Sequence, residues 1–262
     1  MKRAMMWGVS GLLVVGLVSL AIAHPGLIDE QSSVARAAVE KSFPGAVIKD
    51  WQPAPMQGLY MFSLNHDERI FFVDASGRYL LAQAALFDIE KQKNLTQEFI
   101  LHKRQEIIGN VSLDNAILYK PAKHVEGAPK KPLLVFDDPD CPFCRELHGE
   151  VKQLVGAGVP VAIMLHPVER IHKGATQKSV NIWCASDRVE ALDLALSGKP
   201  VPEVKSCETP IEQNLQLARQ LGGGPTPYIV FPDGRTVSGK RSAGELMALL
   251  GMAPTVSQQL LQ

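Results

Sequence analysis

The alternation of apolar and polar residues in the first third of the chain predicts a helix followed by a small antiparallel sheet. Apolar positions recur at helical spacing over 33–43, and a Pro-Gly pair ends the pattern. Four residues are expected on one face of this helix: Val34, Ala37, Ala38 and Phe43. Four shorter runs are typical of strands: 46–51, 59–64, 70–73 and 79–82. We therefore expect an α+β domain over 24–88.

A second amphipathic pattern predicts a linker helix within 89–111. Asn94 stands where its side chain can accept the first free N–H groups of a helix, with Gln97 three residues later, and Gly109-Asn110 ends the pattern. The apolar stripe of this helix is formed by Leu95, Phe99, Ile100, Ile107 and Ile108.

Strand and helix patterns alternate over 112–262, which predicts a second domain. The expected strands are 114–119, 133–136, 159–164, 228–231 and 236–238, and the expected helices are 141–155, 177–196, 211–221 and 242–250. Ser242 and Glu245 form a capping box at the start of the last helix. This order of elements is typical of thioredoxin-like α/β domains with a helical insertion at about 172–222.

The first residues predict an export signal over 1–23. Lys2 and Arg3 precede an uncharged run, and the small-residue pattern Ala21-Ile22-Ala23 is typical of a cleavage site. The run is about 20 residues long, so an uncleaved membrane anchor is the alternative. In both cases the rest of the chain is expected to be exported from the cytoplasm.

The charge balance changes this picture little, because 27 basic residues are matched by 27 acidic ones. A chain without a basic excess gives no indication of nucleic-acid binding.

The motif Cys141-Pro142-Phe143-Cys144 follows the predicted strand 133–136 and opens a predicted helix. Two cysteines at this spacing close a small disulfide ring, and free N–H groups at a helix start favour the thiolate that attacks disulfides. Half of a zinc site and a structural disulfide are the competing interpretations.

The other two cysteines help to separate these interpretations. Cys184 and Cys207 lie 23 positions apart, whereas Cys141 and Cys144 pair only locally or with a substrate. One catalytic and one structural pair is the expected split. A zinc site with all four cysteines is the alternative, although the distant pair lacks the usual ligand spacing. His148 is a further metal-ligand candidate, and we interpret it as a helix-surface residue.

Several strings together resemble the periplasmic thiol:disulfide interchange proteins of the DsbC/DsbG family along nearly the whole exported part. They are the segment 136–144, Leu147-His148, Ile182-Trp183-Cys184-Ala185, Ser206-Cys207 and Gly224-Pro225-Thr226-Pro227-Tyr228. The resemblance implies a cystatin-like N-terminal dimerisation domain, a linker helix and a thioredoxin-fold domain. It also implies a homodimer that acts on misfolded or oxidised exported proteins.

The resemblance also implies a role for each matching residue. Cys141 is expected to attack and Cys144 to resolve, while Thr226-Pro227 is expected to form a cis-proline loop that contacts substrate. Phe143 is expected to add an apolar rim, with helix packing as the alternative. Cys184 and Cys207 are expected to form the structural disulfide of the insertion, with Trp183 in the core.

Three acidic residues, Asp137, Asp138 and Asp140, crowd the approach to Cys141. Negative charge disfavours a nearby thiolate, so we expect them to raise the pKa of Cys141. Asp140 is expected to cap the helix while the other two face water. If one carboxyl lies beneath the dithiol, we expect it to be Asp138, as a proton acceptor for Cys144.

These expectations favour a disulfide isomerase or reductase that is kept reduced by a DsbD-like membrane thiol reductase and needs no cofactor. A dithiol oxidase and a non-enzymatic chaperone remain open, as does metal handling by Cys141, Cys144 and His148.

Overall fold

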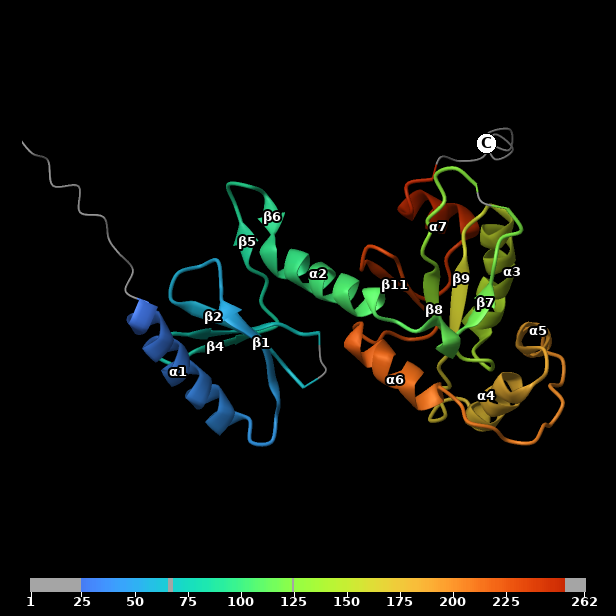
Figure 1. The fold of residues 1–262 in the computed structure, drawn as a ribbon, viewed down its shortest axis with the longest axis horizontal. Coiled ribbons are helices and arrows are strands. Elements are labelled where there is room, and N and C mark those ends of the chain that lie inside the picture. The colour runs from blue at the N-terminus through green and yellow to red at the C-terminus, as the bar shows by residue number, and fades with distance from the viewer. Residues whose placement is uncertain (1–24, 66–67, 124, 253–262) are drawn as a thin grey trace, which may run out of the picture.

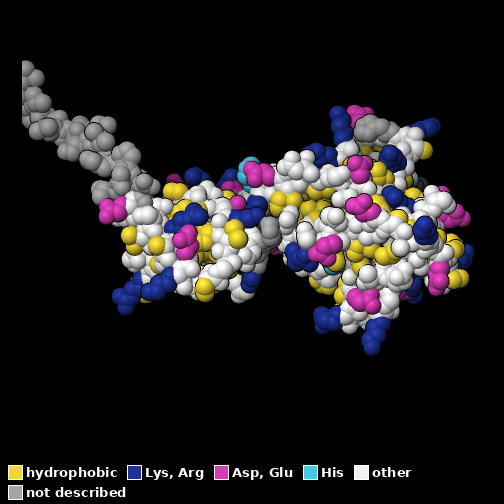
Figure 2. Space-filling view, turned by 60° about the horizontal axis from the view of Figure 1, so that its bottom comes forward, with side chains coloured by type: hydrophobic (Ala, Val, Ile, Leu, Met, Phe, Trp, Pro, Cys, Tyr) yellow, Lys and Arg dark blue, Asp and Glu magenta, His cyan; other side chains and the backbone are white. Residues whose placement is uncertain are grey.

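A computed structural model describes residues 25–65, 68–123 and 125–252, which form two lobes joined by a long helix (Figure 1). The two lobes are also distinct in the space-filling view of Figure 2. The predicted export signal lies outside the described residues. Within the described ranges, no helix is long and apolar enough to cross a membrane.

The N-terminal lobe is one helix packed on a four-stranded antiparallel sheet, which confirms the expected α+β arrangement. The strands lie in the order β1-β2-β3-β4. The elements are α1 (Pro25–Ser42), β1 (Ile48–Pro53), β2 (Leu59–Leu64), β3 (Phe71–Asp74) and β4 (Leu80–Ala82).

Helix α1 differs from the prediction in its start and in its buried face. It begins at Pro25, and its buried residues are Ala35 and Val39, whereas Val34 is 50% exposed. Ala35 and Val39 are four residues apart, so they share a face, and both pack with Phe62 of β2. Small alanines lie on two adjacent faces of this helix, so the sequence pattern alone did not separate them.

The linker helix α2 (Leu95–Gly109) begins where its cap predicts. The Asn94 side chain accepts a hydrogen bond from the backbone N–H of Gln97 at 3.0 Å. The short hairpin of β5 (Phe87–Asp88) and β6 (Lys93–Asn94) precedes the helix and was not predicted.

A buried arginine joins α2 to both lobes. Arg104 is 7% exposed, and its Nε donates to Glu68 Oε2 of the N-terminal lobe at 2.6 Å. Its Nη1 donates to the Gly234 carbonyl of the second lobe at 3.1 Å. Gly234 has a φ of +86°, and a Cβ there would lie 2.7 Å from the Leu101 carbonyl, so this close approach requires glycine.

Replacing Arg104 by alanine should lower the free energy of unfolding by about 2 kcal/mol, because it leaves the half-buried Glu68 carboxylate without this partner. Chemical denaturation measures the change. The control is Arg36→Ala on α1, where an exposed i,i+4 pair with Glu40 is lost and the change should stay within about 0.5 kcal/mol. Equal losses in the two variants would contradict the prediction.

The second lobe is built on a five-stranded sheet in the order β11-β10-β8-β9-β7. The central strand β8 is parallel to β9 and antiparallel to β10. The strands are β7 (Ile117–Tyr119), β8 (Leu133–Asp137), β9 (Val161–Leu165), β10 (Tyr228–Val230) and β11 (Thr236–Ser238). The helices are α3 (Pro142–Gly156), α4 (Ala175–Cys184), α5 (Arg188–Leu196), α6 (Ile211–Gln220) and α7 (Ala243–Leu249). This arrangement confirms the expected thioredoxin-like α/β class with inserted helices.

The structure differs from the predicted elements of this lobe in several places. The single helix expected over 177–196 is two helices, because the chain turns extended at Ala185 and the Asp187 side chain caps α5 by accepting from the Glu190 N–H at 2.9 Å. The strand expected from residue 114 begins at Ile117, after the 3-10 turn η1 (Leu113–Asn115). The capping box of Ser242 and Glu245 is present.

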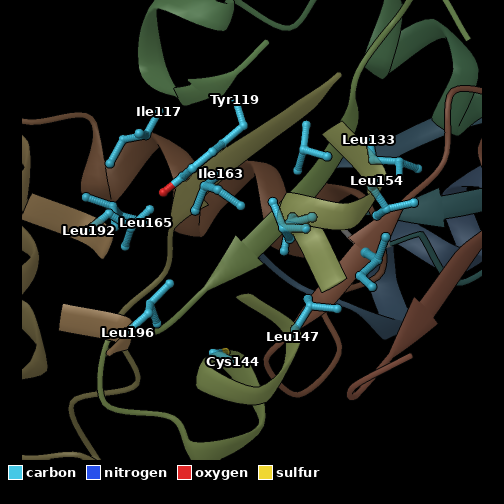
Figure 3. Close-up of a cluster of buried hydrophobic side chains, with 14 of the residues drawn as sticks. Ile117, Tyr119, Leu133, Cys144, Leu147, Leu154, Ile163, Leu165, Leu192 and Leu196 are labelled. Carbon is cyan, nitrogen blue, oxygen red and sulfur yellow. The ribbon is translucent and has the colours of Figure 1, made fainter. Parts of the chain in front are cut away.

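The larger core cluster packs α3, α4, α5 and α7 against one face of the sheet. Figure 3 shows Cys144 and Leu147 of α3 among these apolar side chains. Trp183 is buried in the same cluster, as expected, with the Arg188 guanidinium 3.7 Å from the centre of its ring.

His148 belongs to this buried side of α3, so the expectation of a helix-surface residue is wrong. Its Nε2 lies 3.0 Å from Asp193 Oδ1 of α5, and the Tyr119 hydroxyl donates to the same oxygen at 2.6 Å. Burial lowers the pKa of His148. The residue therefore connects the catalytic-motif helix to the insertion.

Candidate active site

The dithiol lies at the junction of β8 and α3. The Cys141 N–H donates to the Asp138 carbonyl at 3.0 Å, and the Cys141 carbonyl accepts from the Cys144 N–H at 3.1 Å. Cys141 is the N-cap residue, and Pro142 occupies the first helical turn, where a missing N–H leaves no unpaired acceptor. The attacking sulfur therefore sits where free backbone N–H groups favour negative charge.

The surroundings of Cys141 favour its thiolate. Its pKa is lowered to about 5, first by hydrogen bonding from the Cys144 thiol, against the opposing effect of burial. The backbone N–H groups of Cys144 and Phe143 and a hydrogen bond with Thr226 lower it further. The hydrogen bonds to Cys141 therefore outweigh the opposing effect that was expected from the nearby acidic residues.

The carboxyl beneath the dithiol belongs to Asp137, so the choice of Asp138 is wrong. Asp137 is 2% exposed, and burial raises its pKa to about 8, with hydrogen bonding from the Cys144 thiol acting in the opposite direction. Cys144 is fully buried, and burial, the Cys141 sulfur and the Asp137 charge raise its pKa. A buried thiol and a buried carboxyl of raised pKa form a pair suited to passing one proton.

The other two acidic residues also depart from the expectation. Asp138 is fully buried rather than facing water. Asp140 does not cap α3, since no side chain bonds at that cap; its carboxylate pairs with Lys178 of α4 and lies 3.4 Å from Arg145 Nη2. These contacts tie the loop before Cys141 to the insertion.

The Thr226-Pro227 loop lies beside the dithiol. The Thr226-Pro227 peptide bond is cis, and the Thr226 carbonyl lies 3.5 Å from the Cys141 sulfur. Phe143 is 55% exposed at the start of α3. The structure thus brings Cys141, Cys144 and Thr226 together and leaves the Phe143 ring accessible.

The second cysteine pair is separate from the dithiol. Cys184 and Cys207 form a disulfide with an S–S distance of 2.12 Å and a Cα–Cα distance of 5.7 Å. The bond joins the end of α4 to the segment that leads into α6. In the described part of the chain, no group of three or more His, Cys, Asp or Glu side chains is arranged to hold a metal ion.

Replacing both Cys184 and Cys207 by alanine should lower the free energy of unfolding by about 3 kcal/mol. The reason is that the disulfide restricts the unfolded chain by joining two residues that lie 23 positions apart, and the variant lacks this restriction. Urea denaturation without reductant measures the loss. The reactivity of Cys141 should stay unchanged in this variant. A loss below about 1 kcal/mol would contradict the prediction.

A five-stranded sheet that carries a reduced Cys-x-x-Cys at the start of a helix, faced by a cis-proline loop, defines a dithiol protein of thioredoxin fold. The thioredoxin-like domain model matches residues 118–253, and the model of the disulfide bond isomerase protein N-terminal domain matches residues 27–97. The chain belongs to the thioredoxin-like family, in the branch of the DsbC-type thiol:disulfide interchange proteins, and it is a thiol-disulfide oxidoreductase.

Relatives cover almost the whole chain. The thiol:disulfide interchange protein DsbC of Dickeya dadantii is 28% identical over 243 residues, which are 91% of this chain and 94% of the relative. DsbC of Salmonella typhimurium is 28% identical over 253 residues, 95% of each chain. A crystal structure of a disulfide interchange protein from Neisseria gonorrhoeae is 33% identical and covers 54% of this chain and 96% of its own, with a TM-score of 0.46.

Three contacts around the dithiol were missed by the sequence reasoning: Asp137 with Cys144, His172 with Asp138, and Lys178 with Asp140. His172 and Lys178 lie more than 30 residues from their partners, and only the fold brings them there. For Asp137 a local signal existed, since a strand that continues by one residue beyond Phe136 directs that side chain towards α3.

Proposed function

We propose that the protein is a disulfide isomerase or reductase of exported proteins, with Cys141 as nucleophile and Cys144 as resolving thiol. The observation that carries this proposal is the contrast within the dithiol: the pKa of Cys141 is lowered to about 5, while burial raises that of Cys144. One sulfur is therefore ready to attack near neutral pH, and the other is held as a thiol.

The first step is the attack of the Cys141 thiolate on a substrate disulfide. A bond forms between Cys141 and one substrate sulfur, the substrate S–S bond breaks, and the second substrate sulfur leaves as a thiolate that takes a proton from water. If another substrate thiolate then displaces Cys141, the substrate disulfides are rearranged and no electrons are transferred overall.

The alternative second step is reduction. Asp137 accepts the proton of Cys144, and the new thiolate attacks the Cys141 sulfur. The bond between Cys141 and the substrate sulfur breaks, the Cys141–Cys144 disulfide closes, and the substrate sulfur leaves as a thiolate that takes a proton from water. The substrate disulfide has then gained two electrons, and the Cys141–Cys144 dithiol has lost them. Return to the dithiol requires an external thiol donor, which we propose is a DsbD-like membrane reductase.

Substrate contact is proposed for Thr226, Pro227 and Phe143. The Thr226 carbonyl beside the Cys141 sulfur is placed to accept a hydrogen bond from an extended substrate backbone, and the buried Pro227 fixes the chain next to it. The exposed Phe143 ring offers an apolar surface for residues that flank a substrate cysteine.

The N-terminal lobe is proposed as a homodimerisation domain. Within the described residues, the edge strand β4 pairs on one side only, with β3. Leu80 and Leu81 of this strand are exposed at 38% and 48%, and Tyr79 just before it is exposed at 63%. An apolar edge strand is a template for pairing with another chain, and a second copy pairs with it symmetrically. We accordingly divide the chain into a dimerisation domain at 24–88, the linker at 89–111 and the catalytic domain at 112–262, and place the mature protein in the periplasm.

Trapping tests this proposal and determines the direction of electron flow. A Cys144→Ala variant keeps the nucleophile but lacks the resolving thiol, so it should accumulate mixed disulfides with its substrates in the periplasm. Partners with several cysteines indicate isomerisation, and partners with one oxidised cysteine indicate reduction. The control, in which Cys141 is replaced as well, should trap none. An absence of trapped partners in Cys144→Ala would contradict the proposal.

A further inference from the structure

Three consecutive side chains of the linker helix α2 contact the two lobes. Lys103 Nζ donates to Asp50 Oδ2 of β1, in the N-terminal lobe, at 2.5 Å. Arg104 follows, and it bonds to both lobes. Gln105 Nε2 donates to the Asp233 carbonyl, in the turn between β10 and β11 of the second lobe, at 2.8 Å. A single turn of α2 is therefore bonded to the first lobe, to both lobes and to the second lobe in succession.

The strand β1 is irregular at the residue that contacts Lys103. Its pairing with β2 shifts register between Lys49 and Gln52, and Asp50 within this bulge has a φ of +56°, which is uncommon for a residue with a side chain. The buried Ser63 hydroxyl donates to the same Asp50 oxygen at 2.5 Å. Burial opposes the charge of Asp50, yet hydrogen bonds from Lys103 and Ser63 lower its pKa. The carboxylate is therefore charged at neutral pH and attaches α2 to the sheet.

The Glu68 carboxylate lies between Arg104 and the backbone of the second lobe. Gly222, in the turn after α6, has a φ of +102°, and a Cβ there would lie 2.3 Å from Glu68 Oε1. Arg104 Nη1 also lies 3.3 Å from the Thr236 hydroxyl of β11. The side chains of Arg104 and Glu68 are only 8% and 21% exposed. This ion pair is therefore screened less by salt and water than a pair on the surface.

We propose that Lys103, Arg104 and Gln105 form a clamp that fixes the orientation of the second lobe relative to the N-terminal lobe, with the Arg104–Glu68 pair as its central contact. Relative motion is the ordinary expectation for two lobes joined by one segment. Here, rotation of either lobe about α2 would separate these donors from their acceptors and leave half-buried charges unpaired. The clamp makes α2 a rigid spacer, and this inference rests on the contacts between the lobes rather than on the chemistry of Cys141.

The test is the distribution of distances between two spin labels, one on each lobe, measured by pulsed electron paramagnetic resonance in the complete exported chain. The labels are attached through a non-natural amino acid at the exposed positions Glu40 of α1 and Glu212 of α6, so the cysteines stay unmodified. Labelled chains are diluted into an excess of unlabelled chains, so that only distances within one chain contribute. The parent should give one narrow distribution, and Arg104→Ala and Glu68→Gln should each broaden it about twofold. The control His102→Ala, at an exposed position of the same helix, should keep the parent width.

Each outcome supports or overturns the clamp. A broad distribution in the parent overturns it, and so do variants whose distributions stay as narrow as that of the parent. Equal broadening in His102→Ala also contradicts it, because this result indicates a general loosening of α2. Circular dichroism and the rate of Cys141 alkylation by iodoacetamide should stay unchanged in the variants, which shows that each lobe remains folded. If Arg104→Ala does not fold, Glu68→Gln decides alone, because glutamine keeps the shape of the side chain and removes only its charge.

Discussion

Replacing Cys141 by alanine should abolish the reshuffling of scrambled disulfides, with a loss of at least about 10⁴-fold in rate. The reason is that Cys144 cannot substitute for it, because this thiol is fully buried and burial raises its pKa. The measurement is the recovery of active enzyme from a protein with scrambled disulfides.

The same variant separates an enzyme from a chaperone. Suppression of aggregation of a cysteine-free protein should be unchanged, since Cys141 is only 4% exposed and alanine keeps the fold. The matched control replaces Cys184 and Cys207, the pair that does not react, and should retain reshuffling. Full reshuffling activity in Cys141→Ala would remove the basis of the enzymatic mechanism.

Replacing Asp137 by asparagine should slow the release of a mixed disulfide by Cys144 about 100-fold, because the amide cannot accept the thiol proton. In the parent protein the release step should accelerate as the pH rises through about 8, where Asp137 loses its own proton. The variant should lose this dependence. Rapid quenching of a preformed mixed disulfide between Cys141 and a model thiol measures the rate. Asp140→Asn is the control, because that carboxylate pairs with Lys178 instead of facing the dithiol.

The Asp137→Asn variant should also be more stable than the parent near neutral pH. A carboxyl whose pKa is raised on folding retains its proton in the folded protein while the unfolded chain has lost it, so stability falls as the pH rises from about 4 to about 8. The amide has no such cost. A slower and more stable variant would indicate that the carboxyl is retained for catalysis. An unchanged release rate would rule out Asp137 as the proton acceptor.

The sequence predicted the dithiol at a strand-helix junction but not the carboxyl beneath it, and one residue of strand length explains the difference. With β8 ending at Phe136, Asp137 belongs to a turn whose direction is unspecified. The strand continues through Asp137, so period-two alternation places its side chain on the same face as Leu133 and Val135, which α3 covers.

Local sequence patterns could predict the helix starts but not the buried polar residues. Asn94, Ser242 and Glu245 act on neighbours within three residues, so the helix starts they define could be predicted. His148 and Arg104 are polar residues that become buried only through partners distant in sequence, such as Asp193 and Glu68. A helical pattern treats such residues as surface positions, because it contains no information about long-range partners.

The Cys184–Cys207 bond is a disulfide, the same kind of bond on which this thiol-disulfide oxidoreductase acts. A copy produced in a reducing compartment would contain an intact Cys141–Cys144 dithiol and an insertion without its covalent closure. The insertion also holds Lys178, which fixes the loop before Cys141 through Asp140. The mature fold thus contains one cysteine pair as a disulfide that stabilises the insertion and the other pair as a reactive dithiol, so two opposite redox states coexist within a single chain.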